Sequence, residues 1–340
     1  MLRAGIAGCG NIAKVHAESL RQLEDVQLAA FCDRNIEKAN ACVRDYGQEG
    51  TKSYTSVEEM LEKENLDVLH ICLPHSLHVP AAVTALEKGV HVFMEKPPAI
   101  TREQFDTLWN ADKRYGARLG ICFQNRYNEA VEQAHEILDT GTLGQIKGAR
   151  AFVTWNRDKT YYTDSSWRGR KETEGGGVLI NQAVHTLDLL AEFMGRPLRT
   201  EASMANHHLK SFINVEDTLE AYIEFEQGNA CFYATNAYAA DAPVFLEIAC
   251  DKGVIRLEGN ELLIIDEDGA RTAYTYTAKP AAGKIYWGNS HGRCIEDYYR
   301  CLAHNERYRN DLVSCRKVFT LMMDIYEAAE KHSVVVCEKE

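Results

Sequence analysis

Residues 2–13 read LRAGIAGCGNIA, an apolar run of strand character that passes directly into a glycine loop and then into a helical pattern. The loop has the G-x-G-x-x-A form of a dinucleotide-binding turn. Gly8 permits the tight turn, Gly10 lets the backbone approach a pyrophosphate, and the small Ala13 lets the helix pack closely on the strand. The unpaired N–H groups at the start of that helix suit phosphate oxygens. The predicted cofactor contacts in this loop are Gly8, Gly10, Asn11 and Ile12.

An acidic residue stands where the next strand should end. Asp33 lies about 20 residues beyond the glycine loop, the separation at which an acid binds the ribose hydroxyls of a dinucleotide. Its carboxylate would repel a 2′-phosphate, so NAD is favoured as the cofactor. The neighbouring Arg34 could receive that phosphate or stack on adenine, which leaves NADP open.

The first part of the chain alternates short apolar strands with helical patterns. We therefore predict a doubly wound parallel sheet, a Rossmann-type α/β domain, over residues 1–122. Ser56 and Thr101 mark two of the helix starts. The expected strands are 2–7, 27–32, 67–72, 90–94 and 118–122, and the expected helices are 12–23, 35–46, 56–63, 78–88 and 102–114.

From about residue 123 the strand patterns become longer and are separated by turns. We predict that residues 123–340 form an α+β domain with a large, mostly antiparallel open sheet that carries helices on one face, and that this domain binds the substrate and forms the oligomer. The expected strands are 145–156, 198–206, 215–226, 230–239, 243–250, 253–258 and 261–265, and the expected helices are 128–139, 290–304 and 312–331.

Composition excludes several classes of function. A net charge of -12 over 340 residues argues against a nucleic acid or an anionic membrane as the main partner. No apolar run reaches the roughly 20 residues of a membrane-spanning helix. The 11 cysteines are scattered singly without the spacing of a zinc site. We interpret them as reduced core thiols of a cytoplasmic protein and expect no metal.

A lysine follows the apolar run 90–94 in the sequence Glu95-Lys96-Pro97. A buried ammonium group is costly, and the proline excludes helical backbone at Lys96. The lysine should therefore be held at the carboxyl end of a strand, where open α/β sheets bind ligands.

A second polar group occurs within the glycine-rich segment 175–188, which reads GGGVLINQAVHTLD. Asn181 and His185 are four residues apart and so share one face of a helix. His185 can be interpreted as a proton acceptor or, equally well from spacing alone, as a histidine satisfied in the core.

Several motifs occur together in one order along the chain: the glycine loop, the segment 71–78 (ICLPHSLH), Glu95-Lys96-Pro97, Trp167-Arg168-Gly169, the triple-glycine helix, and Tyr286-Trp287-Gly288 with His291. This set resembles the glucose–fructose oxidoreductase / inositol dehydrogenase / rhizopine-catabolism (Gfo/Idh/MocA) family of NAD(P)-dependent oxidoreductases, over nearly the whole chain.

The resemblance implies that Lys96 and His185 are catalytic. His185 would accept a hydroxyl proton, Lys96 would stabilise the alkoxide, and Asn181 would orient the substrate. Many members of the family have aspartate at the position of Asn181, so a proton shared between aspartate and histidine is in doubt here. The asparagine form resembles the branch that includes nucleotide-sugar 3-dehydrogenases. The resemblance also suggests a cis peptide bond between Lys96 and Pro97.

Further residues are predicted to contact the cofactor from the loops that follow the strands. His78 could instead cap or pack the helix that follows it, and Trp167 and Arg168 could hold the substrate instead. These predicted contacts are Pro74, His75, His78, Glu95, Lys96, Gln124, Asn125, Trp167 and Arg168.

The resemblance favours an oxidoreductase that moves a hydride between a nicotinamide cofactor and a secondary alcohol of a sugar, nucleotide sugar or cyclitol. Two alternatives stay open: a non-catalytic dinucleotide-binding regulator and an NAD-dependent glycosidase. The substrate and the direction of the reaction stay open as well. We expect a homodimer or homotetramer that pairs through the open sheet. The predicted interface side carries Glu220, Tyr222 and Glu224 of one strand and Phe232, Ala234, Asn236 and Tyr238 of the next.

Overall fold

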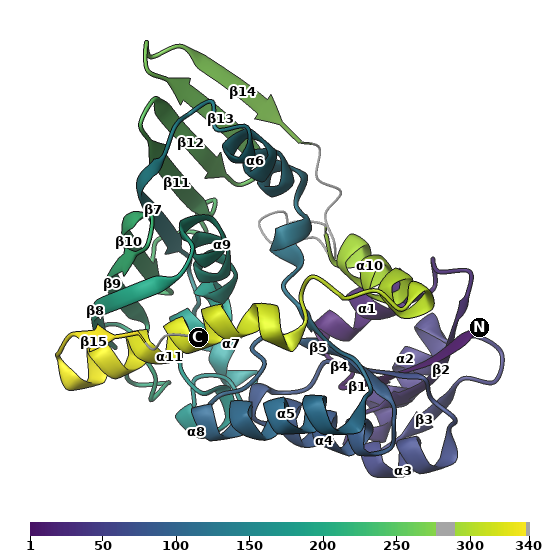
Figure 1. The fold of residues 1–340 in the computed structure, drawn as a ribbon. Coiled ribbons are helices and arrows are strands. Elements are labelled where there is room, and N and C mark those ends of the chain that lie inside the picture. The colour runs from purple at the N-terminus through teal and green to yellow at the C-terminus, as the bar shows by residue number, and fades with distance from the viewer. Residues whose placement is uncertain (277–289, 338–340) are drawn as a thin grey trace. The chain divides into compact units, whose positions relative to one another are not determined.

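The computed structural model describes residues 1–276 and 290–337 (Figure 1). The motif Tyr286-Trp287-Gly288 lies outside these residues. The chain divides into two compact units. Within the described residues, 1–124 and 290–316 form the first unit, and 125–276 and 317–337 form the second. The segment 290–316, which the sequence assigns to the second domain, therefore belongs with the first unit.

The first unit is built on a six-stranded sheet in which every strand pair is parallel. Its order β3-β2-β1-β4-β5-β6 is the Rossmann order, with a change of direction between β1 and β4. The strands are β1 (Leu2–Ala7), β2 (Val26–Cys32), β3 (Lys52–Tyr54), β4 (Val68–Ile71), β5 (His91–Glu95) and β6 (Leu119–Cys122).

Helices cover this sheet, and two of them begin at the predicted caps. The Ser56 side chain accepts the N–H of Glu59, and Thr101 accepts that of Gln104. α1 packs against α2 and α10, and α4 packs against α3 and α5. The helices are α1 (Asn11–Leu20), α2 (Ile36–Tyr46), α3 (Val57–Lys63), α4 (His78–Glu87), α5 (Arg102–Tyr115) and α10 (His291–His304), with a 3₁₀ turn at His75–Leu77.

The late segment completes the edge of the sheet in the first unit. Tyr298 is fully buried, and its hydroxyl lies 2.9 Å from the carbonyl oxygens of Val92 and Arg118. The Asn310 amide donates to the Phe123 carbonyl oxygen over 3.1 Å. Residues near the end of the chain therefore pack on the strands made near its beginning.

The second unit contains a nine-stranded sheet in the order β14-β13-β12-β11-β7-β10-β9-β8-β15. All strand pairs are antiparallel except β7 with β10. The strands are β7 (Ile146–Thr154), β8 (Pro197–Ala205), β9 (Thr218–Phe225), β10 (Gly228–Thr235), β11 (Phe245–Cys250), β12 (Gly253–Glu258), β13 (Glu261–Asp266), β14 (Arg271–Thr275) and β15 (Val335–Val336).

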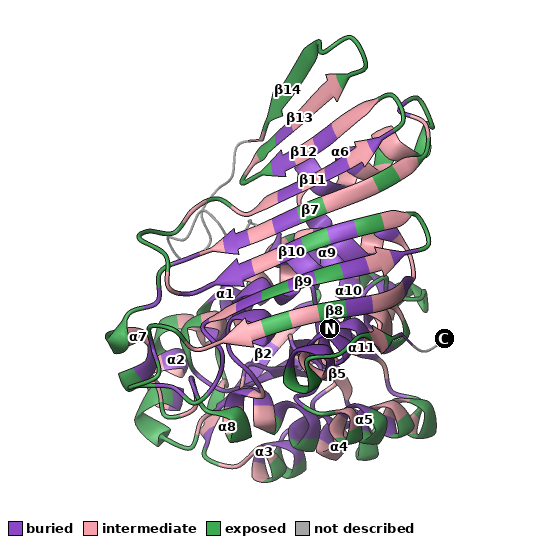
Figure 2. Cartoon of the chain, turned by 90° about the vertical axis from the view of Figure 1, so that its left-hand side faces the viewer, coloured by how far each residue is buried: buried purple, intermediate pink, exposed green. Residues whose placement is uncertain are grey.

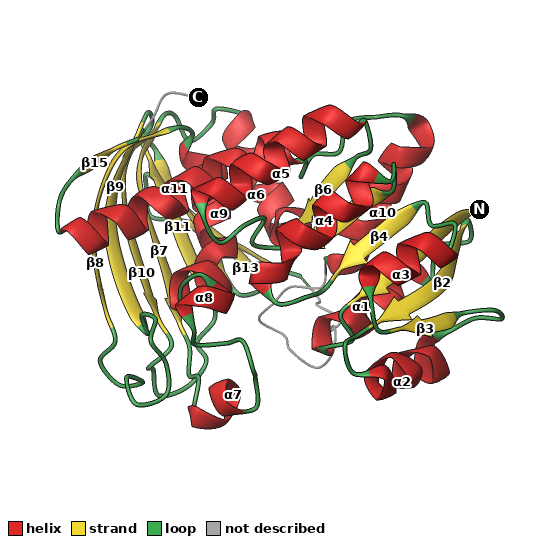
Figure 3. Cartoon of the chain, turned by 90° about the horizontal axis from the view of Figure 1, so that it is seen from below, coloured by secondary structure: helices red, strands yellow, loops and turns green. Residues whose placement is uncertain are grey.

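One face of the nine-stranded sheet is covered by helices. α9 packs on β7, and α6 packs on β12 and β13, both on the same side of the sheet (Figure 3). The helices of this unit are α6 (Glu129–Asp139), α7 (Lys159–Thr163), α8 (Lys171–Glu174), α9 (Val184–Met194), preceded by a π-helix at Leu179–Ala183, and most of α11 (Leu312–Lys331).

Exposed and buried residues alternate along β9 and β10 (Figure 2). Because successive side chains of a strand point to opposite faces, the exposed ones lie on the other face of the sheet. It carries Tyr222, which is 41% exposed and pairs in register with the exposed Cys231.

Of the residues predicted to face a partner copy, Tyr222 is exposed, whereas those of β10 lie in the core. Phe232, Ala234 and Asn236 are buried against the helix side of the sheet, where the Asn236 amide bonds Gln182. Tyr238 lies beyond the end of β10. The prediction was wrong for β10 because strand alternation identifies two faces without saying which one the helices cover.

Two general features agree with the composition. None of the eleven cysteines, all within the described residues, forms a disulfide. Within 1–276 and 290–337, no helix combines the length and the apolar character that a membrane crossing requires.

Candidate active site

The glycine loop of the first unit has the shape of a phosphate cradle. Gly8 has φ +91°, and a Cβ there would lie 2.4 Å from the Cys72 carbonyl oxygen, so only glycine fits. A Cβ on Gly10 would meet no atom of the chain within 4 Å, which leaves the space before the loop open. Gly10 is also the N-cap of α1 and makes no side-chain cap. The first N–H groups of α1 are thus suited to an anionic ligand.

Asp33 extends from the end of β2 to this loop. One carboxylate oxygen accepts the N–H of Cys9 over 3.0 Å, and the other accepts the N–H of Asn35 over 2.9 Å. Arg34, beside it, is exposed. The cradle and the adjacent acid fit the phosphates and the ribose of a dinucleotide.

His78 joins the loops that follow β4 and β5. Its ring is buried, with Nδ1 2.9 Å from the Pro97 carbonyl oxygen and Nε2 2.8 Å from the Leu73 carbonyl oxygen. Burial lowers the pKa of His78, while these two carbonyls act in the opposite direction. Both ring nitrogens of His78 lie within hydrogen-bond distance of backbone carbonyl oxygens. His78 therefore connects the loop after β4 to the loop after β5. Its neighbour His75 is also buried, with its ring 5.6 Å from that of His78.

Lys96 is the one residue between Val92 and Ile100 that is not buried. The peptide bond to Pro97 is cis, as predicted. The preceding Glu95 side chain turns the other way, into the protein.

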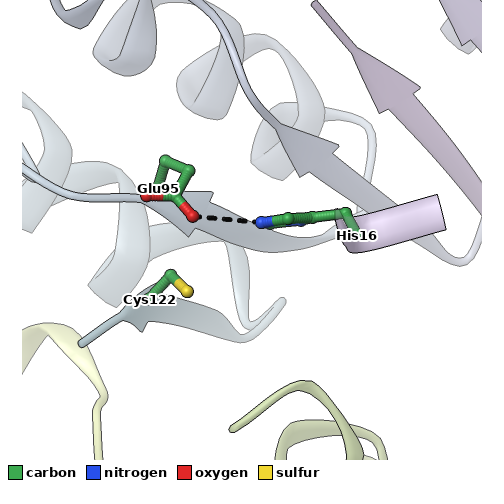
Figure 4. A group of neighbouring side chains, drawn as sticks. All are labelled: His16, Glu95 and Cys122. Carbon is green, nitrogen blue, oxygen red and sulfur yellow. Dashed lines mark hydrogen bonds and ion pairs between the residues drawn. The ribbon is translucent and has the colours of Figure 1, made fainter. Parts of the chain in front are cut away.

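Glu95 lies in a chain of buried polar groups. Its Oε1 is 3.1 Å from His16 Nε2 (Figure 4). His16 Nδ1 is in turn 2.9 Å from His70 Nδ1, and His70 Nε2 is 3.0 Å from the Tyr299 hydroxyl. Burial alone would raise the pKa of Glu95. The hydrogen bond and charge of His16, with His291 and Lys96, instead hold it well below its usual value. Glu95 is therefore an ionised anchor beneath Lys96.

The same group includes Cys122, and ligand atoms of Cys122, His16 and Glu95 lie within 4.8 Å of one another (Figure 4). Both nitrogens of His16 are already in hydrogen bonds, and burial raises the pKa of the Cys122 thiol well above its usual value. The His16–Glu95 hydrogen bond is itself enough to explain why these buried groups lie together.

In the second unit the triple glycine is explained by packing. A Cβ on Gly176 would lie 2.1 Å from the Tyr326 hydroxyl, and one on Gly177 would lie 1.9 Å from the Glu216 carbonyl oxygen. Gly176 and Gly177 therefore permit the close approach of a neighbouring side chain and of neighbouring backbone. The Glu216 carboxylate then accepts the N–H of Gly177 over 2.8 Å and starts the helix.

Asn181 and His185 are the only residues between Gly176 and Ala191 that are not buried. Asn181 lies in the π-helix Leu179–Ala183, and His185 lies in the first turn of α9. Such π-helical turns are frequent at functional sites. The sequence thus predicted correctly that these two side chains share one face.

A polar network holds the inner side of this face. The Asn181 amide nitrogen donates to the Glu174 carboxylate in a short hydrogen bond and lies 3.5 Å from the Tyr161 hydroxyl. The Gln182 amide nitrogen donates to the same hydroxyl over 3.0 Å. The Arg168 guanidinium lies 4.4 Å from the centre of the Tyr161 ring.

Glu174 is the residue of this site that the sequence did not reveal. It is 1% exposed, and burial raises its pKa to about 7, against the lowering effect of the Gly169 N–H, Asn181 and Arg168. Nothing in the run Lys171-Glu172-Thr173-Glu174 distinguishes it from a solvated charge, so only its burial identifies it.

Other predicted contacts lie around these groups. Trp167 and Arg168 are half-buried in the second unit, and Asn125 has a buried side-chain oxygen without a hydrogen-bond partner among residues 1–276 and 290–337. Gln124 is buried at the end of the first unit.

Family models match both parts of the chain. Residues 2–123 match the model described as "Oxidoreductase family, NAD-binding Rossmann fold", and residues 131–256 match the "GFO/IDH/MocA C-terminal domain". D-glucoside 3-dehydrogenase of Escherichia coli (strain K12) is 30% identical over 254 residues, which is 69% of this chain and 70% of that protein.

Solved structures share the whole architecture. The WlbA dehydrogenase from Bordetella pertussis, in complex with NADH and UDP-GlcNAcA, is 26% identical and has a TM-score of 0.87, covering 100% of this chain and 99% of that chain. A levoglucosan dehydrogenase in complex with NADH and levoglucosan has the same fold, with a TM-score of 0.88 at 21% identity over 100% of both chains. The chain therefore belongs to the GFO/IDH/MocA family of NAD-dependent oxidoreductases, and its first unit contains the NAD-binding Rossmann domain.

Proposed function

We propose that the protein is a dehydrogenase for a secondary alcohol of a sugar, nucleotide sugar or cyclitol. One observation carries the proposal. Each unit contains a buried stretch of chain, and the few residues of that stretch that are partly exposed have polar side chains able to act on an alcohol. These are Lys96 in the first unit and Asn181 and His185 in the second. The substrate class is supported by relatives named D-glucoside 3-dehydrogenase and inositol 2-dehydrogenase, and by WlbA, which was solved with a nucleotide sugar.

The residues have distinct proposed roles. NAD bound at the glycine loop supplies the hydride acceptor, and Gly10 and Asp33 hold its phosphates and ribose. His185 accepts the hydroxyl proton of the substrate as general base. The Lys96 ammonium stabilises the negative charge that develops on the alkoxide oxygen of the substrate. Asn181 orients the substrate. Pro74, His75, Asn125, Trp167 and Arg168 are proposed to contact the cofactor or the substrate.

The experiment is a panel of inositols, free sugars and nucleotide sugars, incubated with the enzyme and NAD⁺ or NADP⁺ and followed by NADH or NADPH absorbance. We expect steady production of NADH with one substrate class and weaker turnover with NADP⁺. A regulator would give no turnover, and a glycosidase that re-reduces its intermediate would cleave substrate without accumulating NADH. Either result would contradict the proposal.

We also propose that the protein is a cytoplasmic homo-oligomer. Eleven cysteines without a disulfide suit a reducing compartment. The open face of the nine-stranded sheet carries a mixed aromatic and charged surface. The rings of Phe152 and Phe245 stack with their centres 5.5 Å apart. The Glu247 carboxylate accepts hydrogen bonds from Arg150 and Arg256. A surface of this composition suits an interface between two copies related by two-fold symmetry.

A further inference from the structure

Glu174 ends α8, and the roles proposed above leave it without a function. The neighbouring Lys171 and Glu172 are exposed, whereas Glu174 is almost fully buried. Its Oε2 accepts the N–H of Gly169 and its Oε1 accepts the Asn181 amide, both in short hydrogen bonds. Between Gly176 and Ala191 two polar side chains are partly exposed, those of Asn181 and His185. The buried Glu174 carboxylate bonds Asn181 directly.

This contact fixes the orientation of the Asn181 amide. An ionised carboxylate can only accept hydrogen bonds, so it selects the NH₂ group of the amide rather than the carbonyl oxygen. The Tyr161 hydroxyl lies on the same side, 3.5 Å from that nitrogen. The carbonyl oxygen of Asn181 is on the other branch of the amide and is turned away from Glu174.

A protonated Glu174 would reverse the arrangement. A carboxylic acid donates one hydrogen bond, and the natural acceptor for it is the amide oxygen of Asn181. The Gly169 N–H still needs the other carboxyl oxygen, so Glu174 itself cannot turn. Asn181 must therefore rotate its amide by about half a turn, which directs the NH₂ group away from Glu174.

We propose that Glu174 is a positioning residue that determines, through its own protonation, whether Asn181 presents a carbonyl oxygen or an NH₂ group to the substrate. The inference rests on the proposed function, because it assigns Asn181 to a hydroxyl group of the substrate beside the reacting carbon. It does not require Glu174 to touch the substrate or the cofactor.

The surroundings allow both protonation states near neutral pH. Burial raises the pKa of Glu174 to about 7, and the Gly169 N–H, Asn181 and Arg168 favour the ionised form. Glu216 favours the protonated form. The titratable and charged groups facing this carboxyl from the elements around it are Arg168, Glu216, Tyr161 and Tyr162 of α7, and Tyr326 of α11.

Two variants should lock the two orientations. In Glu174→Gln the side-chain oxygen is held by the Gly169 N–H, so the new NH₂ group faces Asn181 and turns its carbonyl oxygen inward, as in the protonated enzyme. In the double variant E174Q/N181D the glutamine donates to a carboxylate that presents only acceptors, as in the ionised enzyme. The glutamine does not titrate, and the carboxylate introduced by N181D, which accepts the glutamine NH₂ group, should stay ionised between pH 5.5 and 8.5. Exposed Glu172→Gln, on the same helix, is the matched control.

The test measures KM and kcat between pH 5.5 and 8.5 for the substrate found in the panel. The two orientations of Asn181 offer the substrate hydroxyl either an acceptor or a donor, so the wild-type KM should change about tenfold as pH rises through 7, the effect of one hydrogen bond made in only one orientation. E174Q should keep, at every pH, the KM that the wild type has at acidic pH, and the KM of E174Q/N181D, whose absolute value the change at Asn181 will alter, should not vary with pH. E172Q should behave as wild type.

Circular dichroism and NADH affinity show whether each variant is folded. If E174Q is not folded, the double variant provides the test, because a KM that still changes about tenfold through pH 7 in E174Q/N181D would contradict the inference. Wild-type pH dependence of KM in E174Q would overturn it and leave the proposed dehydrogenase function intact. Absence of NADH from every substrate would overturn the proposed function and, with it, the role given to Asn181.

Discussion

The Nε2 atom of His16 lies 3.1 Å from Oε1 of Glu95, and both residues are buried in the first unit. His16 belongs to the helix that follows the glycine loop, and Glu95 ends the strand that leads to Lys96. One hydrogen bond therefore connects the helix that is predicted to receive the cofactor phosphates with the strand that positions the proposed catalytic lysine.

Replacing His16 by leucine should destabilise the protein strongly, because it leaves an ionised carboxylate buried without its main partner. Breaking a buried pair of this kind costs about 3–5 kcal/mol. Urea unfolding of H16L, E95Q and H16L/E95Q measures the effect, and the double variant should lose less stability than the sum of the two single variants. Full additivity would show that the contact contributes nothing. The exposed pair Arg44–Asp45 supplies a control in R44A, which should be near wild type.

Stability should decline as the pH falls from about 6.5 to about 4, partly because of His291. Burial lowers the pKa of His291 to about 4, whereas the same group in an unfolded chain has a pKa of about 6.5. Between these values the unfolded chain binds a proton that the folded protein does not, so protonation favours unfolding. The slope from one such group is at most about 1.4 kcal/mol per pH unit. The variant H291N should flatten the decline, and H304N, at an exposed position, should not. An unchanged slope in H291N would contradict the assignment.

Replacing His185 by asparagine should lower turnover by roughly 10²–10⁴-fold, the usual contribution of a general base. NADH affinity should be largely kept, because the residue belongs to the second unit and the glycine loop to the first. Stopped-flow rates and NADH fluorescence titration separate the two effects. The exposed His208→Asn is the control. Near-normal turnover in H185N would remove His185 from the mechanism.

The two glycines of the loop should respond differently to alanine. In G10A the new methyl group meets no atom of the protein, so the fold should persist while NADH binding weakens, because the methyl group occupies the approach of the pyrophosphate. In G8A the methyl group collides with the Cys72 carbonyl oxygen at a positive φ, so the protein should be destabilised or fail to fold. Thermal melting and NADH titration check both variants. Unchanged NADH affinity in a folded G10A would argue against a cofactor phosphate at this loop.

In solution the mass should be a multiple of 38.3 kDa, with pairs formed through the open sheet face. Tyr222→Glu places a charge in the middle of that face and should shift the mass toward a monomer in light scattering. L77E, at an exposed residue of the first unit, should leave the mass unchanged. A wild-type monomer at micromolar concentration would refute the proposed assembly.

Much of the fold could be predicted because strands and helices follow local patterns. The strands at 2–7 and 253–258 have the predicted bounds, and the helix at 312–331 agrees to the residue. The three-residue β3 and the fully exposed β14 were missed, since neither has an apolar pattern. The sheet order depends on pairing between distant residues, which periodicity does not encode.

The candidate site was predicted unevenly for a similar reason. Asn181 and His185 could be found because helical spacing places them on one face. Glu174 could not, because a glutamate among charged residues is indistinguishable from a solvated one until its burial is known. Gly176 and Gly177 stand out in the sequence as part of a glycine-rich segment. Glycine is required there because Tyr326 and Glu216, which lie far away in the sequence, approach the backbone closely.

The packing of Tyr298 and Asn310 on β5 and β6 has a consequence for synthesis on the ribosome. A nascent chain that has just emerged through β6 has every strand of the Rossmann sheet, yet it still lacks the side chains that bond Val92, Arg118 and Phe123. Those side chains are translated only after the strands β7 to β14 of the other unit. The unit that contains the NAD-binding domain is thus begun before the other unit and completed only after strands β7 to β14 have been made.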